Sequence, residues 1–167
     1  IIFSYAKDQH NSSPINKNLA LLLPTSGSTG SAKFVRISHL NIQSNAGSII
    51  NYLKINTKDM TVTTLPMSYS FGLSIINSYF YAGATLIMTN KSVVSRDFWT
   101  IMKSNKITSI SGVPYIFELL DKLGFFKKCY PSLGTITQAG GRLKRDLKKQ
   151  ILEYSIADNI DFFVMYG

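Results

Sequence analysis

Residues 24–33 read PTSGSTGSAK and combine glycines, hydroxyl groups and one lysine. Gly27 and Gly30 are three positions apart, so the backbone can turn tightly and direct several N–H groups into one hollow. Four hydroxyl side chains precede Gly30, Ser31 adds a fifth, and Lys33 adds a mobile positive charge. Many donors, one cation and little side-chain bulk are what a polyphosphate ligand requires.

The loop does not follow the Walker A pattern, in which glycine directly precedes the lysine and Ser or Thr follows it. Here Ala32 precedes Lys33 and Phe34 follows it. A polar surface loop remains an equally good interpretation of residues 24–33, since Gly, Ser and Thr are ordinary loop residues. The loop alone therefore leaves both interpretations open.

Other reactive side chains are few. The chain has two histidines and one cysteine, too few for a His/Cys metal cage, and we expect no metal site built from them. Cys129 has no partner for an internal disulfide, which favours a reducing, cytoplasmic setting. His39 follows Ser38 at an expected helix start, so a structural role is the preferred interpretation.

The elements that must position these residues alternate along the chain. The expected strands are residues 19–23, 61–65, 84–88, 108–111, 135–138 and 160–165, the first of them buried. The expected helices are residues 39–53 (capped by Ser38), 72–81, 96–104, 114–123 and 143–154. Alternation of this kind predicts an α/β fold with a mostly parallel sheet and flanking helices. Residues 1–18 are expected to be a strand or linker remnant.

Composition excludes several classes of protein. The 167 residues are 45% hydrophobic and 16% charged, which argues against a disordered chain. The apolar run Leu19–Leu23 has five residues, far short of the roughly 18 that a membrane span requires, and no leader peptide is recognisable. The net charge of +9 favours anionic partners. Its densest part, residues 142–149, is read as a solvated helix surface in preference to a nucleic-acid patch, because no nucleic-acid-binding signature accompanies it.

The segment Thr25–Lys33, followed by Ser38-His39-Leu40-Asn41, resembles the phosphate-loop signature of the adenylate-forming (AMP-binding) superfamily. Acyl-CoA synthetases, luciferases and peptide-synthetase adenylation domains belong to it. The family pattern is Thr-Ser-Gly-(Ser/Thr)-Thr-Gly-x-Pro-Lys, and Ala32 replaces its proline. This change removes no ligand group.

Four further motifs resemble the family in the same order. Residues 65–73 resemble the segment beside the acyl carboxylate, and Val113-Pro114 resembles the helix start behind the acyl pocket. Residues 138–143 resemble the Gly-Gly-x-x-Leu region against adenine, with Arg142 in place of a more usual Ala or Glu. Tyr166-Gly167 resembles the start of Tyr-Gly-x-Thr-Glu, whose tyrosine stacks on adenine.

The resemblance implies roles for residues spread over most of the chain. The implied phosphate-binding residues are Thr25, Ser26, Gly27, Ser28, Thr29, Gly30 and Lys33. The implied adenine-binding residues are Gly140, Gly141, Arg142, Tyr166 and Gly167. Tyr69, Phe71 and Gly72 would border the acyl substrate, and Lys33 and Tyr69 would be catalytic. Tyr69 and Phe71 also have the plainer interpretation of packing the core under a loop.

The implied reaction activates a carboxylic acid with ATP to an acyl-adenylate, aided by Mg²⁺. A thioester with coenzyme A or a phosphopantetheine carrier would follow. Members of the family are about three times longer, so residues 19–167 are interpreted as an incomplete AMP-binding domain that lacks the magnesium ligand and the carboxy-terminal domain. We expect such a fragment to be inactive alone and to expose apolar edges through which it can self-associate. The alternative is a non-catalytic nucleotide-binding or scaffolding module.

Overall fold

The computed structural model describes residues 14–24 and 33–166, which form two compact units divided between Asn41 and Ile42. In the first unit, strands β1 (Leu19–Pro24) and β2 (Phe34–Ser38) form an antiparallel pair in which Leu22 lies opposite Arg36. The prediction of a buried strand at residues 19–23 was wrong. Each residue of β1 is partly or fully exposed, because among the described residues of its unit only β2 pairs with it.

Helix α1 (His39–Leu53) begins where the sequence predicted. The Ser38 hydroxyl accepts a hydrogen bond from the Asn41 backbone N–H at 3.1 Å, and the Asn41 side-chain oxygen accepts one from the Ser38 N–H at 3.0 Å. This reciprocal pair satisfies two backbone donors at the helix start, as a capping box does. Ala46 and Ile49 are buried, whereas Leu40 in the first turn is 71% exposed.

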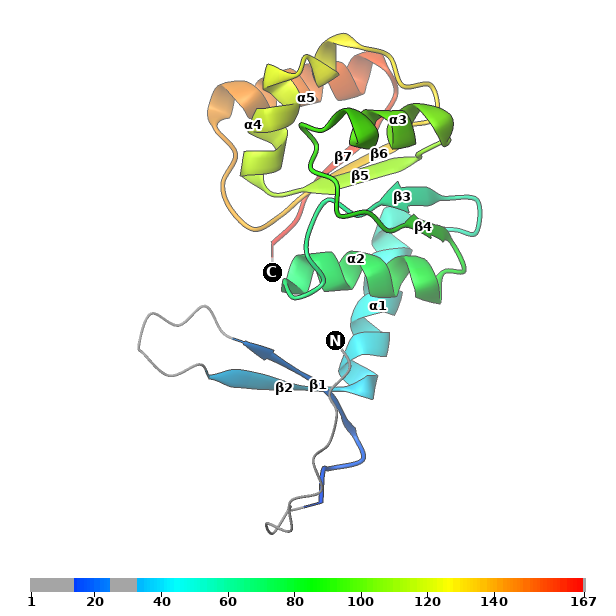
Figure 1. The fold of residues 1–167 in the computed structure, drawn as a ribbon, viewed down its shortest axis with the longest axis vertical. Helices are drawn as coiled ribbons and strands as arrows, with labels where there is room; N and C mark the ends of the chain where they lie inside the picture. The colour runs from blue at the N-terminus through cyan, green and yellow to red at the C-terminus, as the bar shows by residue number, and fades with distance from the viewer. Residues whose placement is uncertain (1–13, 25–32, 167) are drawn as a thin grey trace. The chain divides into compact units, whose positions relative to one another are not determined.

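The second unit has a five-stranded parallel sheet in the order β4-β3-β5-β6-β7 (Figure 1). Its strands are β3 (Met60–Val62), β4 (Thr85–Ile87), β5 (Ser109–Gly112), β6 (Thr135–Gln138) and β7 (Asp161–Val164). Its helices, besides most of α1, are α2 (Ser70–Tyr81), α3 (Arg96–Ser104), α4 (Pro114–Lys122) and α5 (Arg145–Ala157), with a 3₁₀ turn η1 (Phe125–Lys127). The predicted α/β fold with a parallel sheet is confirmed.

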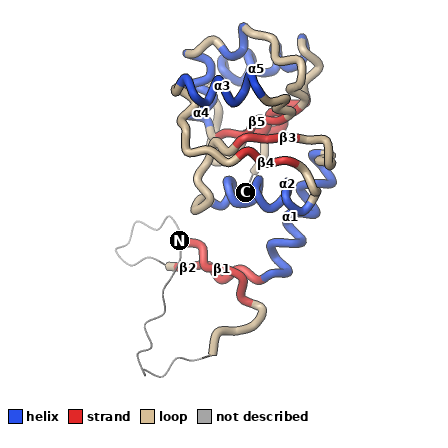
Figure 2. The backbone as a smooth tube through the Cα atoms, turned by 45° about the vertical axis from the view of Figure 1, so that its right-hand side comes forward, coloured by secondary structure: helices blue, strands red, loops and turns tan. Residues whose placement is uncertain are grey.

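Helices α3, α4 and α5 cover one face of the sheet, and α1 and α2 lie on the other (Figures 1 and 2). The first face holds the main apolar core, in which Val62, Ile110 and Ile136 of three adjacent strands pack with helix side chains. Side chains alternate between the faces of a strand. The opposite face therefore presents the intervening residues, Thr61, Ser109, Ser111 and Thr137, which we call the hydroxyl face.

Local signals explain where α3 and α4 begin. Ser95 caps α3 by accepting a hydrogen bond from the Phe98 N–H at 3.2 Å, and Pro114 occupies the first turn of α4, where no N–H partner is lost. Strand boundaries differ from the predictions. The strand expected at residues 61–65 is β3, which ends at Val62, so that Thr63 and Thr64 already belong to the following loop. Among the described residues, no helix combines the length and apolar character that crossing a bilayer requires.

Candidate functional site

Residues of α1, of α2 and its N-terminal flank, and of the ends of β6 and β7 line an open pocket of about 350 Å³ in the second unit, which we call the Tyr69 pocket. Its lining comprises Asn45, Ser48, Ile49, Tyr52, Tyr69, Ser70, Phe71, Ser74, Ala139, Gly140, Met165 and Tyr166. The last four residues directly follow the carboxyl ends of β6 and β7. Ligands of open parallel sheets bind at this edge. The pocket thus lies where the fold class places a site.

Two glycines make the turn that follows β6. Gly140 has a φ of +76° and Gly141 a φ of +152°, values that L-residues with side chains rarely adopt. The fully buried Gln138 braces this turn, because its Nε2 donates to the carbonyl oxygens of Ala139 at 3.0 Å and Gly141 at 2.8 Å. The backbone around Gly140 is therefore held in one conformation.

Tyr69 lies over that turn. A Cβ added to Gly140 would collide with the Tyr69 hydroxyl oxygen and would meet Val113 Cγ1 at 3.0 Å. The Tyr69 backbone N–H donates to the Pro66 carbonyl at 3.1 Å, and its carbonyl accepts from the Leu73 N–H at 2.9 Å. The side chain is 38% exposed. Tyr69 is thus positioned at the start of α2 with its hydroxyl beside the glycine turn and its ring on the pocket.

Phe71 and Gly72, the other two residues predicted to border the acyl substrate, are both buried. Phe71 lines the Tyr69 pocket. Gly72 does not, because its missing side chain would point into the backbone of Pro66, where a Cβ would collide with the carbonyl oxygen. Its position explains a tight helix–loop contact, and its role toward substrate stays a prediction.

The predicted adenine-binding residues divide between two spaces. Gly140 and Tyr166 line the Tyr69 pocket, whereas Gly141 and Arg142 line a second pocket of about 380 Å³ on the far side of the turn. Arg145 and Lys148 of α5 also line this second pocket, and none of its described lining residues is acidic. Of the neighbouring lysines, Lys144 forms an ion pair with Glu118 at 2.9 Å, and Lys149 forms one with Glu153 at 3.7 Å.

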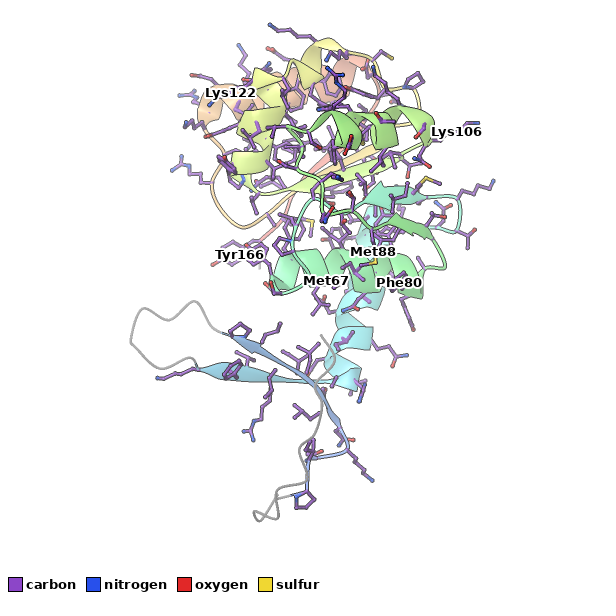
Figure 3. All side chains as sticks on the ribbon, in the orientation of Figure 1. Met67, Phe80, Met88, Lys106, Lys122 and Tyr166 are labelled. Carbon is purple, nitrogen blue, oxygen red and sulfur yellow. The ribbon has the colours of Figure 1, made fainter. Side chains whose placement is uncertain are left out.

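Tyr166 ends the described chain beside the start of α2 (Figure 3). Its side chain is fully exposed. Its backbone neighbour Met165 is held to the turn, since the Met165 N–H donates to the Gln138 carbonyl at 2.7 Å. The backbone before Tyr166 is therefore tied to the turn after β6, and the tyrosine side chain extends from it into solvent.

Several predicted residues fall outside this pocket. Lys33 is exposed and belongs to the first unit, so its phosphate-binding role stays a prediction. The predicted ligands at residues 25–30, together with Gly167, lie outside the described residues. The predicted division of the chain at residue 18 also stays a prediction. No group of three or more His, Cys, Asp or Glu side chains gathers among the described residues.

Helix α1 supplies pocket residues that sequence reasoning missed. Asn45, Ser48 and Tyr52 line the Tyr69 pocket, and their spacing of three and four residues places them on one helix face. The same spacing is visible in the sequence as a polar and aromatic stripe beside the apolar one. Tyr52 also contacts Phe163 of β7, with ring centroids 6.2 Å apart.

The hydroxyl face carries a hydrogen-bonded network under α2. Thr137 Oγ1 donates to Ser111 Oγ at 2.7 Å, and Thr61 Oγ1 donates to the Ser109 carbonyl at 3.0 Å. Burial raises the pKa of Tyr79 to about 12, although hydrogen bonds to Ser109 and Thr61 oppose the rise. Tyr79 therefore stays protonated and acts as a neutral partner of these hydroxyls.

Comparison with known proteins agrees with this fold. The sequence profile of the family described as "AMP-binding enzyme" matches residues 3–167. The probable CoA ligase CCL9 of Humulus lupulus is 26% identical over 150 residues, which cover 81% of this chain and 28% of that protein. The chain therefore spans little more than a quarter of this relative's length.

Two solved structures extend the comparison. The N-terminal domain of FACL13 from Mycobacterium tuberculosis superposes with a TM-score of 0.77 at 21% identity, over 98% of this chain and 40% of that one, which shows a shared fold. The O-succinylbenzoate coenzyme A synthetase of Bacillus subtilis, solved with AMP, gives a TM-score of 0.73 at 28% identity, over 87% of this chain and 29% of that one.

Proposed function

Since the chain belongs to the family of AMP-binding enzymes, we propose that it supplies the carboxylate-activating site of an adenylate-forming ligase. The observation that carries the proposal is the meeting of Tyr69, Gly140 and Tyr166 in one pocket at the carboxyl edge of the sheet. These residues come from three separate motifs of the family pattern. Their meeting is what a site for an acid and an adenine nucleotide requires.

In the proposed reaction a carboxylate oxygen of the acid attacks the α-phosphorus of ATP. A bond forms between this carboxylate oxygen and the α-phosphorus. The bond between the α-phosphorus and the oxygen that bridges it to the β-phosphorus breaks, and pyrophosphate leaves with that electron pair. The two anions repel each other, so the site must hold them together and offset charge. Lys33 and the hydroxyl-rich residues 25–30 would bind the phosphates that depart.

The Tyr69 pocket would hold the other two reactants. The exposed Tyr166 ring would stack on adenine, and the Gly140 backbone, which has no side chain to obstruct it, would lie against the base. The Tyr69 hydroxyl, beside Gly140, would donate a hydrogen bond to the acid's carboxylate. Magnesium commonly accompanies ATP, but no described cluster of acidic side chains fits it, so no step is assigned to a metal.

A second half-reaction would transfer the acyl group to a thiol. The thiolate sulfur attacks the acyl carbon, and the carbon–oxygen bond to AMP breaks as AMP leaves. The similarity to a CoA ligase and a coenzyme A synthetase supports coenzyme A as the acceptor, and a phosphopantetheine carrier is the alternative. Residues beyond this chain would contribute to that step.

Titration of the 167-residue chain with AMP, followed by NMR, tests the nucleotide site. We expect shifts concentrated at Ala139, Gly140 and Tyr166, and a Tyr166→Ala variant that binds AMP more weakly by about 1–3 kcal/mol, the usual value of one base–aromatic stack. A Tyr115→Ala variant is the matched control, because that exposed tyrosine lies outside the pocket. Equal losses in both variants, or shifts elsewhere, would contradict the assignment.

A further inference from the structure

The pocket on the far side of the glycine turn, which we call the Arg142 pocket, gathers positive charge. Its volume is about 380 Å³, and Gln138 and Val164, the last residues of β6 and β7, line it at the carboxyl edge of the sheet. Three of its other lining residues are cationic, namely Arg142, Arg145 and Lys148. Ligands of open parallel sheets bind at this edge, so the charge lies where a ligand can use it.

These three cations have no carboxylate partner among the described residues. The ion pairs of α5 belong to Lys144 and Lys149, which are next in sequence to lining residues but do not line the pocket. Asp146, the acidic residue in the first turn of α5, is not a lining residue either. The positive charge at the pocket is therefore available to an anionic ligand.

The N-terminus of α5 adds backbone donors to the same place. The helix begins at Arg145, and the side chain of its N-cap residue Lys144 makes no capping hydrogen bond. Within the described part of the chain, no group accepts a hydrogen bond from the N–H of Arg145, Asp146 or Leu147. Free N–H groups and the helix dipole together favour an anion at a helix start.

Gln138 supplies an observation that is independent of charge. Its side chain is fully buried, and its Nε2 donates to the carbonyl oxygens of Ala139 and Gly141. Its Oε1 accepts no hydrogen bond from any described residue. A buried acceptor without a donor is costly and uncommon in folded proteins. Because Gln138 lines the Arg142 pocket, a hydrogen-bond donor on a ligand there would satisfy this oxygen.

These groups together describe a ligand with two features. The cations and the free N–H groups suit a phosphate monoester, whose oxygens accept from several donors and whose charge at neutral pH is about −1.5 to −2. The Gln138 oxygen would repel an anion and requires a hydroxyl or amino group instead. A volume of about 380 Å³ lies within the usual range of small-molecule sites, so it accommodates a phosphate together with the group that carries it.

We propose that the Arg142 pocket binds the phosphate monoester of a hydroxylated compound, either a sugar phosphate or a nucleotide. Arg142, Arg145 and Lys148, with the first N–H groups of α5, bind the phosphate, and a hydroxyl of the compound donates to Gln138 Oε1. Arg142 thereby has a phosphate-binding role in place of the adenine contact that the family pattern implies. The site is separate from the Tyr69 pocket and does not rest on the proposed function.

The test is titration of the 167-residue chain with four phosphates, followed by NMR of the backbone N–H groups of residues 145–147 and the Gln138 side-chain amide. Glucose 1-phosphate and adenosine 3′-monophosphate represent the two sources of the ligand. Phenyl phosphate has a phosphate monoester but no further hydroxyl, and inorganic phosphate has no carrier. We expect shifts at these groups and a hydroxylated compound that binds about tenfold more tightly than phenyl phosphate, as one added hydrogen bond allows. The tighter of the two hydroxylated compounds identifies the source.

Two double variants assign the binding to the pocket. Arg145→Gln combined with Lys148→Gln should weaken the binding of the preferred compound by at least about tenfold, because two charged donors are lost. Lys103→Gln combined with Lys149→Gln is the matched control. It removes the same number of charges from α3 and α5 at positions outside the pocket, so the affinity should change little.

Three results overturn the inference. They are no shifts at residues 145–147 with any of the four phosphates, equal losses of affinity in the two double variants, and binding of phenyl phosphate as tight as that of the two hydroxylated compounds. A hydroxylated phosphate that is preferred about tenfold, and that is weakened only by the pocket variant, supports it. The AMP titration read at Gly140 and Tyr166 tests the proposed function separately, so that function stands or falls independently.

Discussion

Replacement of Gly140 by alanine tests the arrangement at the centre of the site. Gly140 has a φ of +76°, and a Cβ there would collide with the Tyr69 hydroxyl and lie 3.0 Å from Val113 Cγ1. The left-handed backbone alone costs an alanine about 1–2 kcal/mol. Crowding against Tyr69 and Val113 should add about 1 kcal/mol, at the low end of overpacking because a tyrosine tip can move. We therefore expect a total loss of about 2–3 kcal/mol.

Two companion variants separate these contributions in urea unfolding of the chain. Gly124 has a φ of +69° and no atom within 4 Å of its added Cβ, so Gly124→Ala should show the backbone cost alone. Tyr69→Phe removes the hydroxyl oxygen and leaves the ring. Because Val113 Cγ1 would still lie 3.0 Å from the added Cβ, Gly140→Ala in the Tyr69→Phe background should cost less than in the parent chain by at most about 1 kcal/mol.

Two results would contradict the crowding expected at Gly140. A Gly140→Ala loss no larger than that of Gly124→Ala would mean that nothing crowds Gly140. A loss unchanged by Tyr69→Phe would mean that the hydroxyl does not lie over the glycine turn. Either result would refute the placement of Tyr69.

Three further outcomes are expected from unfolding measurements on the chain. Gly72→Ala should destabilise the chain by about 2 kcal/mol or more, because the new Cβ would strike the Pro66 carbonyl. Gly47→Ala in α1 should instead stabilise it by about 0.5–1 kcal/mol, because its Cβ would meet only Tyr81 at 3.9 Å. Losses of equal size in the two variants would contradict this packing. The pKa of Tyr79 is near 10 in the unfolded chain and about 12 in the folded chain. Below pH 10 the tyrosine should not affect the free energy of unfolding, which should fall by about 2–3 kcal/mol as the pH rises to 12. Tyr79→Phe should reduce this slope. Ser38→Ala should cost about 1 kcal/mol by removing the cap of α1, and Ser44→Ala, in the middle of that helix, should cost less; equal costs would argue against the cap.

The order of strands and helices in the second unit could be predicted from the sequence because its signals are local. Ser38, Ser95 and Pro114 mark helix starts, and the runs SIS and TIT at residues 109–111 and 135–137 alternate with the period of a strand. Local signals do not say what covers a strand. Leu19–Leu23 was therefore predicted to be buried, although its only described strand partner is β2.

Strand β2 was overlooked although Phe34, Val35 and Ile37 favour a strand, because the segment follows directly on the glycine-rich loop and was read as part of that motif. Three residues assigned to the site from the sequence, Tyr69, Gly140 and Tyr166, line one pocket, and their binding roles stay predictions. Asn45 and Ser48 could not be added from their own motif. Their place in the pocket depends on which face of α1 turns toward α2. The packing of Ile49 of α1 against Ile55 and Tyr79 determines that face.

The hydroxyl face likewise could not be predicted from the sequence. Thr61, Ser109, Ser111 and Thr137 are small polar residues that the sequence alone does not distinguish from exposed ones. The parallel register brings Ser109 beside Thr61 and Ser111 beside Thr137. Only then do four separate hydroxyls become one buried polar surface.

The central claim is that this chain carries part of a carboxylate-activating nucleotide site, and acid-dependent ATP–pyrophosphate exchange tests it most directly. Labelled pyrophosphate, ATP and a panel of carboxylic acids would be supplied to the protein at the full length its gene encodes. The account predicts label in ATP only when a suitable acid is present, and a decrease of about a hundredfold for Lys33→Ala, the usual effect of removing one charge-stabilising group. Exchange that needs no acid, exchange that is absent with every acid, or exchange unchanged by Lys33→Ala would contradict it.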